Sequence, residues 1–294
     1  MKLSFAGVGG AFCGQNQWQT NAVLSKDDGE RRNLLIDCGS DARFSLTELG
    51  VALPDIGGVY ISHLHADHVG GMEWLAFCTY FNPTLDRLTL FCDLTLMHKM
   101  WESTLRGGLD SIEGKVMTLT DYFDCQPIVA NGSFKWGDAE LTPVQTVHVM
   151  AGYQIVHSFG LMISVGPETA QNRALRGLFE LTGDEAVADK RKKIFYTSDT
   201  QFCPNQIMKF YKEAHLIFQD CEIGTPKSGV HAHYDDLKTL PSEIKRKMWL
   251  MHYKSNPPQE SKIVGSSDAN PEAVVQVIAD GFAGFVKKWQ EFVL

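Results

Sequence analysis

The sequence predicts an α/β protein in which two β-sheets pack face to face and helices cover the outside. Short β-favouring apolar runs crowd the first part of the chain, and farther along such runs alternate with segments of helical periodicity. The chain has 294 residues, 44% of them hydrophobic and 21% charged, which is the balance of a soluble globular protein with a large core. Since no repeat or low-complexity segment divides it, we expect residues 1–294 to form a single domain.

The elements follow from local pattern. Strands are expected where β-favouring apolar runs occur, at residues 3–8, in a run ending at residue 24, and at 34–36, 57–62, 88–92, 194–196, 216–218 and 248–251. Helices are expected at residues 71–80, 94–105 and 204–213, and a last helix from residues 235–236 onward. The helix over 94–105 is predicted to have one apolar face, formed by Leu94, Met97, His98, Trp101 and Leu105. Polar segments of chemical interest come just after the strands, where loops on a rigid scaffold carry function.

The formal net charge of the chain is −8. Nucleic-acid binding depends on neutralising phosphates, so this charge disfavours a long nucleic acid as the main partner. We interpret the basic run Lys190-Arg191-Lys192-Lys193 as a solvated surface. Small anionic substrates stay compatible with the acidic balance, because bound metal ions would supply positive charge locally.

The seven cysteines never fall as Cys-x-x-Cys, and the sequence has neither an apolar run that spans a bilayer nor a signal peptide. We therefore expect reduced thiols and a cytoplasmic protein without a membrane partner, located in the host cytoplasm if a virus encodes it.

The most informative stretch is Ser62-His63-Leu64-His65-Ala66-Asp67-His68-Val69-Gly70-Gly71. Three imidazoles and one carboxylate lie close together there, between a predicted strand and a predicted helix. Imidazole nitrogen suits zinc and similar divalent ions, and carboxylate oxygen completes such a set of ligands. In a loop, His63 and His65 can turn to one ion while Asp67 and His68 turn to a second, so this stretch predicts a two-metal site.

His-x-His-x-Asp-His followed by Gly-Gly resembles the signature of the metallo-β-lactamase fold, a four-layer αββα sandwich with metals at one sheet edge. The resemblance supplies later candidates, each after an apolar strand: His148, Asp199 and His252 as ligands, and Asp37 as a supporting carboxylate. It implies a first ion held by His63, His65, His148 and Asp199. It implies a second ion held by Asp67, His68, Asp199 and His252. Zn²⁺ is the expected metal, with Mn²⁺ as the alternative.

Asp199 stands in Thr197-Ser198-Asp199-Thr200, where the common zinc lactamases carry cysteine, so the chain resembles the ribonuclease Z and phosphodiesterase branch instead. In ribonuclease Z an acidic residue and a following histidine assist protonation of the leaving group. The candidates here are Asp220 or Glu222 with His231 or His233, and Asp67 joins them as a predicted catalytic residue. The sequence departs from the ribonuclease Z pattern at Gln219-Asp220-Cys221-Glu222, where His-Glu-Ala-Thr is typical.

Within this branch the chain is most similar to the anti-Pycsar enzymes, which cleave 3′,5′-cyclic mononucleotides. The similarity covers most of the chain. Its most specific segments are Gly229-Val230-His231-Ala232-His233-Tyr234 and Met248-Trp249-Leu250-Met251-His252-Tyr253. Ribonuclease Z inserts a long Gly/Pro-rich arm between its third and fourth motifs to grip tRNA, whereas residues 164–193 here are interpreted as charged helix. The resemblance implies a small cyclic-nucleotide phosphodiesterase, commonly a homodimer, that would serve immune evasion against cyclic-nucleotide signalling.

Two metal ions about 3.5–4 Å apart would clamp the phosphoryl oxygens and activate a bridging hydroxide, and an imidazolium would protonate the leaving oxygen. A cyclic diester would yield a nucleoside monophosphate. Two alternatives stay open: a ribonuclease Z-like tRNA 3′-processing endonuclease, and a binding protein that sequesters nucleotides at a vestigial site.

The remaining histidines have simpler interpretations. His98 and His215 are predicted to have structural roles, and His157, at a predicted strand start beside Ser158-Phe159-Gly160, is a candidate for bordering the pocket.

Overall fold

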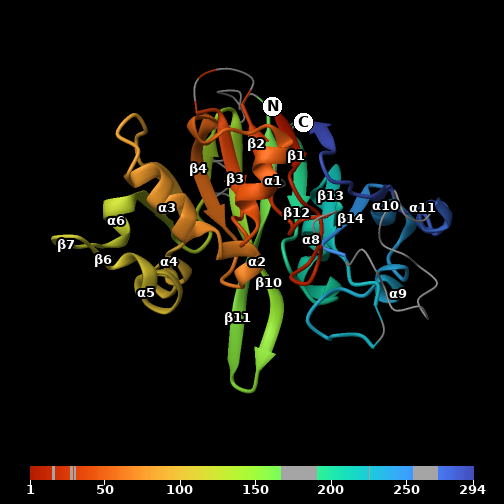
Figure 1. Cartoon of the computed structure of the whole chain (residues 1–294). Helices are drawn as coiled ribbons and strands as arrows, with labels where there is room; N and C mark the ends of the chain where they lie inside the picture. Colours follow the sequence, from red (N-terminus) through yellow and green to blue (C-terminus); the bar gives the residue numbers. More distant parts are fainter. Residues whose placement is uncertain (15–16, 27–28, 30, 167–190, 225, 254–270) are drawn as a thin grey trace, which may run out of the picture.

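Two mixed β-sheets form the centre of the molecule in the computed structural model, which describes residues 1–14, 17–26, 29, 31–166, 191–224, 226–253 and 271–294 (Figure 1). Among these residues, each large sheet has seven strands. The first sheet has the order β16-β1-β2-β3-β4-β5-β8, formed by Lys2–Phe5 (β1), Ala22–Ser25 (β2), Asn33–Ile36 (β3), Ile56–Ile61 (β4), Leu88–Asp93 (β5), Phe123–Ile128 (β8) and Glu291–Val293 (β16). The second has the order β15-β14-β13-β12-β11-β10-β9, formed by Phe134–Trp136 (β9), Ala139–Ala151 (β10), Gln154–Val165 (β11), Lys192–Tyr196 (β12), Leu216–Asp220 (β13), Met248–Met251 (β14) and Gly284–Phe285 (β15).

Both sheets follow the same plan, antiparallel at one side and parallel at the other. In the first sheet β1, β2 and β3 pair antiparallel, and β3, β4, β5 and β8 pair parallel. In the second sheet β9 to β12 pair antiparallel, and β12 to β15 pair parallel. Parallel neighbours require crossover connections, so the chain leaves β4, β12 and β14 at one edge of the sheets. The candidate site lies at that edge.

Helices cover the outer face of each sheet. Those beside the first sheet are Ala42–Leu49 (α1), Ala66–Val69 (α2), Met72–Tyr80 (α3), Leu94–Met100 (α4), Arg106–Leu109 (α5) and Leu119–Tyr122 (α6), with a 3₁₀ turn at Leu53–Asp55 and a small hairpin of Ser111–Ile112 (β6) and Lys115–Val116 (β7). Those beside the second sheet are Pro204–Glu213 (α8), Tyr234–Leu237 (α9), Ser242–Lys245 (α10) and Pro271–Ala279 (α11). No helix in the described part of the chain is long and apolar enough to cross a membrane.

The apolar core lies in two layers. Between the sheets, the rings of Phe5 and Phe218 meet at a centroid distance of 5.0 Å, and Tyr60 stacks on Phe134 at 5.7 Å. A second cluster fills the space between the first sheet and its helices, with Leu75 of α3 among its buried members. The order helix, sheet, sheet, helix confirms the predicted four-layer αββα sandwich.

Three predicted elements differ from the structure. The first strand ends at Phe5, because the Val8 carbonyl turns away to accept from the backbone N–H of His252 at 2.8 Å. The last helix was expected to begin near Asp235-Asp236, whereas α9 begins at Tyr234 and already ends at Leu237, and Pro241, which cannot continue a helix, precedes α10. The expected charged helix over 164–193 falls mostly outside the described residues, and its two ends belong to β11 and β12.

The predicted apolar face of the helix over 94–105 is also wrong. Leu94 and His98 are exposed, whereas Met97 and Leu105 are buried. The buried residues of α4 are Leu96, Met97 and Met100, so Leu94 and His98 lie on its outer side, and a π-helical turn at Trp101–Leu105 follows.

The full length of the hairpin of β10 and β11 was not predicted, because the sequence indicated only an apolar strand before His148 and a strand start at His157. Its tip extends beyond the body of the molecule in Figure 1, and residues 149–157 there include no buried side chain, so no buried face imposes an apolar alternation on them.

Candidate metal centre

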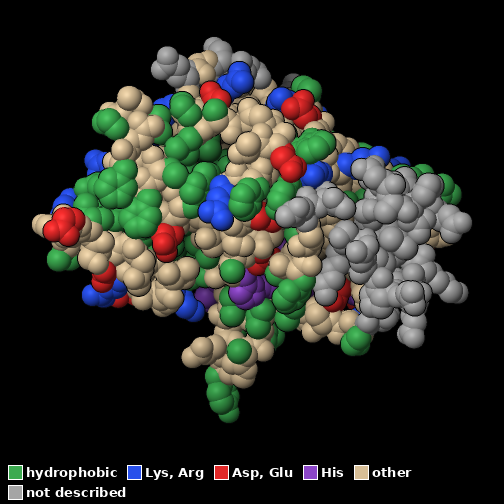
Figure 2. All heavy atoms as spheres, viewed as in Figure 1, with side chains coloured by type: hydrophobic (Ala, Val, Ile, Leu, Met, Phe, Trp, Pro, Cys, Tyr) green, Lys and Arg blue, Asp and Glu red, His purple; other side chains and the backbone are tan. Residues whose placement is uncertain are grey.

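The predicted ligands come together at one edge of the sandwich. His63 and His65 follow β4, and Asp67 and His68 belong to the short helix α2. Asp199 follows β12, and the remaining two ligand candidates come from β10 and from the loop after β14. Figure 2 shows histidine side chains at the surface just above the projecting hairpin. Four stretches of chain far apart in sequence therefore converge on one place.

Two groups of four residues have the geometry of metal sites, with the ligand atoms in each group within 4.8 Å of one another. The groups are His63, His65, His148 and Asp199, and Asp67, His68, Asp199 and His252. These are the two sets that the family resemblance implied, and Asp199 belongs to both.

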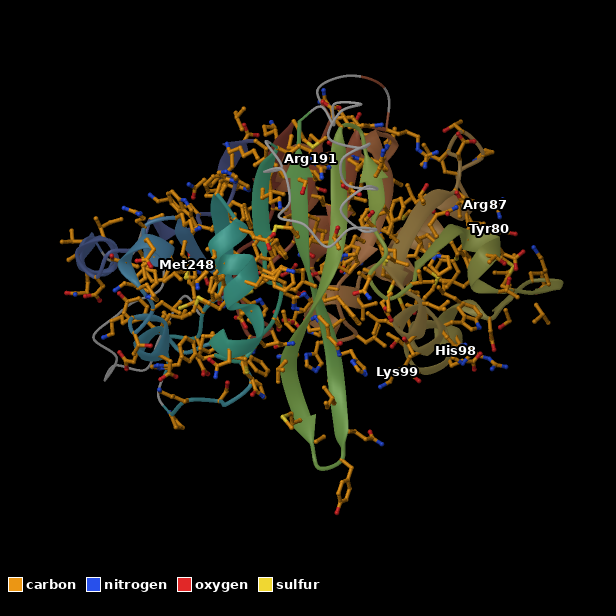
Figure 3. All side chains as sticks on the ribbon, turned by 180° about the vertical axis from the view of Figure 1, so that it is seen from behind. Tyr80, Arg87, His98, Lys99, Arg191 and Met248 are labelled. Carbon is orange, nitrogen blue, oxygen red and sulfur yellow. The ribbon has the colours of Figure 1, made fainter. Side chains whose placement is uncertain are left out.

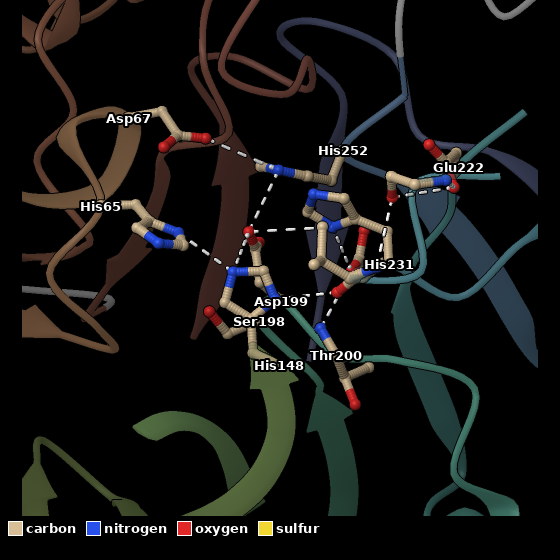
Figure 4. Close-up of polar contacts among 12 residues, drawn as sticks. His65, Asp67, His148, Ser198, Asp199, Thr200, Glu222, His231 and His252 are labelled. Atoms are coloured by element: carbon tan, nitrogen blue, oxygen red, sulfur yellow. Dashed lines mark hydrogen bonds and ion pairs between the residues drawn. The ribbon is translucent and has the colours of Figure 1, made fainter. Parts of the chain in front are cut away.

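Asp199 lies at the centre of the cluster (Figure 4). Its Oδ1 atom is 3.2 Å from His68 Nε2, and its Oδ2 atom is 3.3 Å from His252 Nε2. The Nε2 atoms of His63 and His148 are each 3.6 Å from Oδ2. Oδ2 thus faces members of both groups, and Oδ1 faces His68 of the second group, so the carboxylate lies between the two groups as a bridging ligand would.

Hydrogen bonds to the Nδ1 atoms orient two of these imidazole rings. The Nδ1 atom of His148 lies 2.8 Å from the carbonyl of Val230, and His252 Nδ1 lies 3.2 Å from the Thr20 hydroxyl. A ring nitrogen that donates to an oxygen in this way leaves Nε2 free to accept a metal.

Asp37 supports the cluster in the way the sequence predicted. Its carboxylate lies 2.8 Å from His68 Nδ1 and accepts from the backbone N–H and the hydroxyl of Ser62, both at 2.8 Å. Because Ser62 directly precedes His63, one buried carboxylate holds both the metal-binding loop and the His68 ring.

The residues present fit a pair of divalent cations. His68 Nε2 is buried and has no hydrogen-bond partner among the described residues. Asp37, Asp67, Asp199 and Asp220 are all buried around it, and that much negative charge requires cations.

The pKa shifts in the protein without metal agree with this fit. Burial, reinforced by neighbouring imidazoles, lowers the pKa values of His63 and His65. Burial would also lower the pKa of His68, but Asp199, Asp67 and Asp37 outweigh it and raise that pKa well above the usual range. Burial would raise the pKa of Asp67, yet His68 and His252 bring it to about 2. A proton on His68 thus balances the carboxylates, and metal binding would release it.

Strained backbone surrounds the cluster. Asp37, Ser198 and His252 have φ angles of 66°, 51° and 65°, in the left-handed region that non-glycine residues rarely adopt. Such residues persist where the surrounding structure holds them, and they gather at functional sites.

His148 reaches the cluster by a route that the sequence did not predict. It was expected to follow a strand, but it lies inside β10 at a bulge, where Val147 pairs with His157 and Val149 pairs with Val156. A bulge inserts an unpaired residue and can redirect its side chain toward a site.

The two candidate proton donors differ sharply. His231 Nδ1 lies 2.8 Å from Asp220 Oδ2, and the His231 ring lies 5.2 Å from that of His148 and 5.0 Å from that of His252. Burial would lower the pKa of His231, but Asp220 outweighs it and raises that pKa to about 10. His231 also completes a third group with Asp199, Asp220 and His252, which overlaps the second metal group.

His233 and Glu222 form hydrogen bonds within their own loop rather than with the cluster. His233 Nδ1 accepts from the backbone N–H of Asp235 at 3.2 Å and caps α9, while its Nε2 lies 3.0 Å from the Gly224 carbonyl. Glu222 accepts from the backbone and the hydroxyl of Ser228. The structure therefore brings Asp220 and His231 to the cluster and leaves Glu222 and His233 in the loop behind it.

The remaining histidines lie outside the cluster. His215 accepts from the backbone N–H of Lys193 at 3.1 Å, in line with its predicted structural role. His98 is exposed on α4 and does not pack in the core. His157 lies within β11 rather than at its start, and it borders a pocket next to the metal-binding loop.

A family model for the anti-Pycsar protein Apyc1 matches residues 1–292. The chain belongs to this family. Among curated members, the anti-Pycsar protein Apyc1 of Paenibacillus harenae is 32% identical over 256 residues, covering 86% of this chain and 90% of its own length. The Apyc1 protein of Bacillus phage vB_BsuM-Goe3 is 30% identical over 259 residues, covering 87% of this chain and 90% of its own length.

Solved structures give the fold of this Apyc1 family member. The metallo-β-lactamase fold protein YhfI from Bacillus subtilis superposes with a TM-score of 0.66 at 15% identity, covering 99% of this chain and 98% of its own. Unliganded yeast PDE1 superposes with a TM-score of 0.67 at 10% identity, covering 100% and 99%. The short form of human tRNase Z gives a TM-score of 0.61 at 14% identity, also covering 100% and 99%. The fold is the metallo-β-lactamase fold.

Proposed function

We propose that this Apyc1 family member is a metal-dependent phosphodiesterase that hydrolyses 3′,5′-cyclic mononucleotides to nucleoside monophosphates. The observation that carries the proposal is the pair of four-residue groups that share Asp199. Paired metal sites joined by one carboxylate are suited to phosphoryl transfer, because the charge of the diester is spread over several oxygens. Membership of the Apyc1 family supports a role against cyclic-nucleotide signalling.

His63, His65, His148 and Asp199 would hold one ion, and Asp67, His68, Asp199 and His252 the other. The ions would supply positive charge at the phosphate and an activated water. Imidazoles and carboxylates suit Zn²⁺, with Mn²⁺ as the alternative.

His231 is the proton donor in this proposal. Asp220 occupies its Nδ1 side, so Nε2 carries the proton that the leaving ester oxygen takes up. Asp220 also accepts from the backbone N–H of Thr200 at 2.9 Å, which keeps the carboxylate in place while the ring changes charge.

The charged surface supports a small substrate rather than tRNA. Arg191 pairs with Glu140 at 2.8 Å, and Lys193 pairs with Glu213 at 3.3 Å. These basic side chains are therefore paired with carboxylates of the same protein, and they add little positive charge to a surface that could bind a nucleic-acid backbone.

The test is turnover by the purified protein on cyclic mononucleotides, cyclic dinucleotides and a precursor tRNA, with metal content measured on the same sample. We expect close to two transition-metal ions per chain, release of nucleoside monophosphate, and far slower cleavage of the tRNA trailer. Equal or faster tRNA cleavage would make the chain a ribonuclease Z-like enzyme. Tight nucleotide binding without turnover in the metal-loaded protein would make it a sequestering protein.

Three further expectations stay predictions. Light scattering tests the homodimer, and fractionation of cells tests the cytoplasmic location. A single cooperative unfolding transition tests the single domain, which is supported by the pairing of β1 with the C-terminal strand β16.

A further inference from the structure

The loop after β12 carries Asp199, and it also contacts β10, which is not a neighbour of β12 in the sheet. The strand order is β12-β11-β10, so the loop has to pass β11 before it meets β10. Two backbone carbonyls at the end of β12, those of Tyr196 and Thr197, lie against Gly160 of β11, and a Cβ atom at residue 160 would be 2.5 Å from each of their oxygens. Glycine at this position therefore permits the close approach of the loop.

Hydrogen bonds join the loop to β10 at its bulge. The Thr146 hydroxyl donates to the carbonyl of Asp199 at 3.0 Å. The backbone N–H of Gln201 donates to the Val147 carbonyl at 2.7 Å, and the side-chain amide of Gln201 donates to the His148 carbonyl at 2.6 Å. The loop that carries Asp199 and the bulge that carries His148 thus form one hydrogen-bonded unit.

The bulge depends on support from outside the hairpin. The register between β10 and β11 skips His148, so the ladder does not fix the direction of this residue. Figure 3 shows both strands continuing from the sheet into the projecting part of the hairpin, and residues 149–157 have no buried side chain, whereas His148 is buried. Since core packing ends at the bulge, hydrogen bonds such as the one from the Gln201 amide have to hold the His148 backbone.

A fixed backbone gives the His148 ring a single direction. Its Nδ1 atom lies 2.8 Å from the Val230 carbonyl, and its Nε2 atom lies 3.6 Å from Asp199 Oδ2. A ring held both through its backbone and at Nδ1 presents Nε2 to the cluster. The residue that holds the backbone has to donate to a carbonyl oxygen, which the amide of glutamine does and a carboxylate does not.

We propose that Gln201 is a positioning residue for the metal group that contains His148, because its side-chain amide holds the bulge that turns the His148 imidazole toward Asp199. The inference rests on the proposed function for the presence of metal, and Gln201 acts through the backbone of a ligand rather than as a ligand. Gln206 of α8 provides the contrast. Its side-chain amide also donates to a carbonyl of β10, that of Gln145 at 3.0 Å, but outside the bulge.

The experiment is a stepwise Zn²⁺ titration of each variant in competition with a chromophoric chelator. His148→Ala identifies the binding step of the ion that His148 would hold. In Gln201→Met, the affinity of that step should fall by about 10–100-fold, the usual loss when a group that orients a metal ligand is removed, while the other step changes much less. Gln206→Met removes the same kind of hydrogen bond from the same strand, and both of its affinities should equal those of the wild type. Unchanged affinities in Gln201→Met, or an equal loss of both, would overturn the proposal.

A second measurement uses the metal-free protein. With ¹⁵N-labelled histidine, the Nδ1–H of His148 should give an imidazole N–H signal in NMR spectra, because its hydrogen bond to the Val230 carbonyl slows exchange with water. The spectrum of His148→Ala assigns this signal. We expect it to persist in Gln206→Met and to disappear in Gln201→Met. An unchanged signal in Gln201→Met, or no such signal in the wild type, would overturn the proposal. If the wild type binds no metal, the proposed function fails, and this spectrum still decides whether Gln201 orients His148.

Discussion

Replacing His231 by alanine should slow catalysis without removing metal. His231 belongs to neither of the two metal groups, and its hydrogen bond at 2.8 Å is to Asp220. Losing a general acid typically costs about 10²–10⁴-fold in rate, and we expect the fall in kcat on a cyclic mononucleotide to lie in that range. Asp220 keeps its hydrogen bond from the backbone N–H of Thr200, so the buried carboxylate is not left without a partner. Steady-state kinetics and metal analysis of the same preparation measure both effects.

The matched control is His233→Ala, two residues farther along the same loop. His233 caps α9, and removing a helix cap costs roughly 0.5–2 kcal/mol of stability. This variant should therefore unfold at a lower denaturant concentration while its folded fraction keeps the wild-type kcat. The defect of His231→Ala should shrink on a p-nitrophenyl diester, whose leaving group needs little protonation. Loss of metal from His231→Ala, or an equal defect on both leaving groups, would refute the role as proton donor.

Three other substitutions test the centre. Asp199→Ala should abolish binding of both ions, measured by elemental analysis, because its two oxygens face both groups; retention of one tightly bound ion would contradict a bridging role. Asp220→Asn should move the basic limb of the profile of kcat/KM against pH to lower pH. Asp220 raises the pKa of His231 to about 10, and without its charge the imidazolium is lost sooner as the pH rises; an unmoved limb would show that another group sets it. Gly10→Ala should weaken metal binding with little loss of stability, because a Cβ atom there would lie 3.3 Å from His252 Nε2. Unchanged affinity in a zinc titration would show that the loop containing residue 10 moves to accommodate the added methyl group.

The four-layer fold and the set of residues that meet at the candidate metal centre were predictable from the sequence. His63, His65, Asp67 and His68 lie within one short loop and helix, so their spacing alone brings them together. Asp199 and His252 follow buried strands, and the ends of neighbouring parallel strands meet at one edge of a sheet. Such features depend on local pattern and on the few ways in which sheets can be connected.

Tertiary structure decided the direction of side chains whose neighbours are distant in sequence. His148 turns into the cluster because β10 bulges and the Val230 carbonyl accepts its Nδ1 proton, and no local pattern contains either contact. His231 and His233 are equivalent by spacing, and only the folded loop pairs one with Asp220 and the other with α9. The pocket next to the metal-binding loop likewise exists only once α4 packs next to β11. Sequence pattern thus determined which residues are candidates for the metal centre. Packing between distant segments determined which of them face the cluster, because hydrogen bonds across elements set the orientation of each ring.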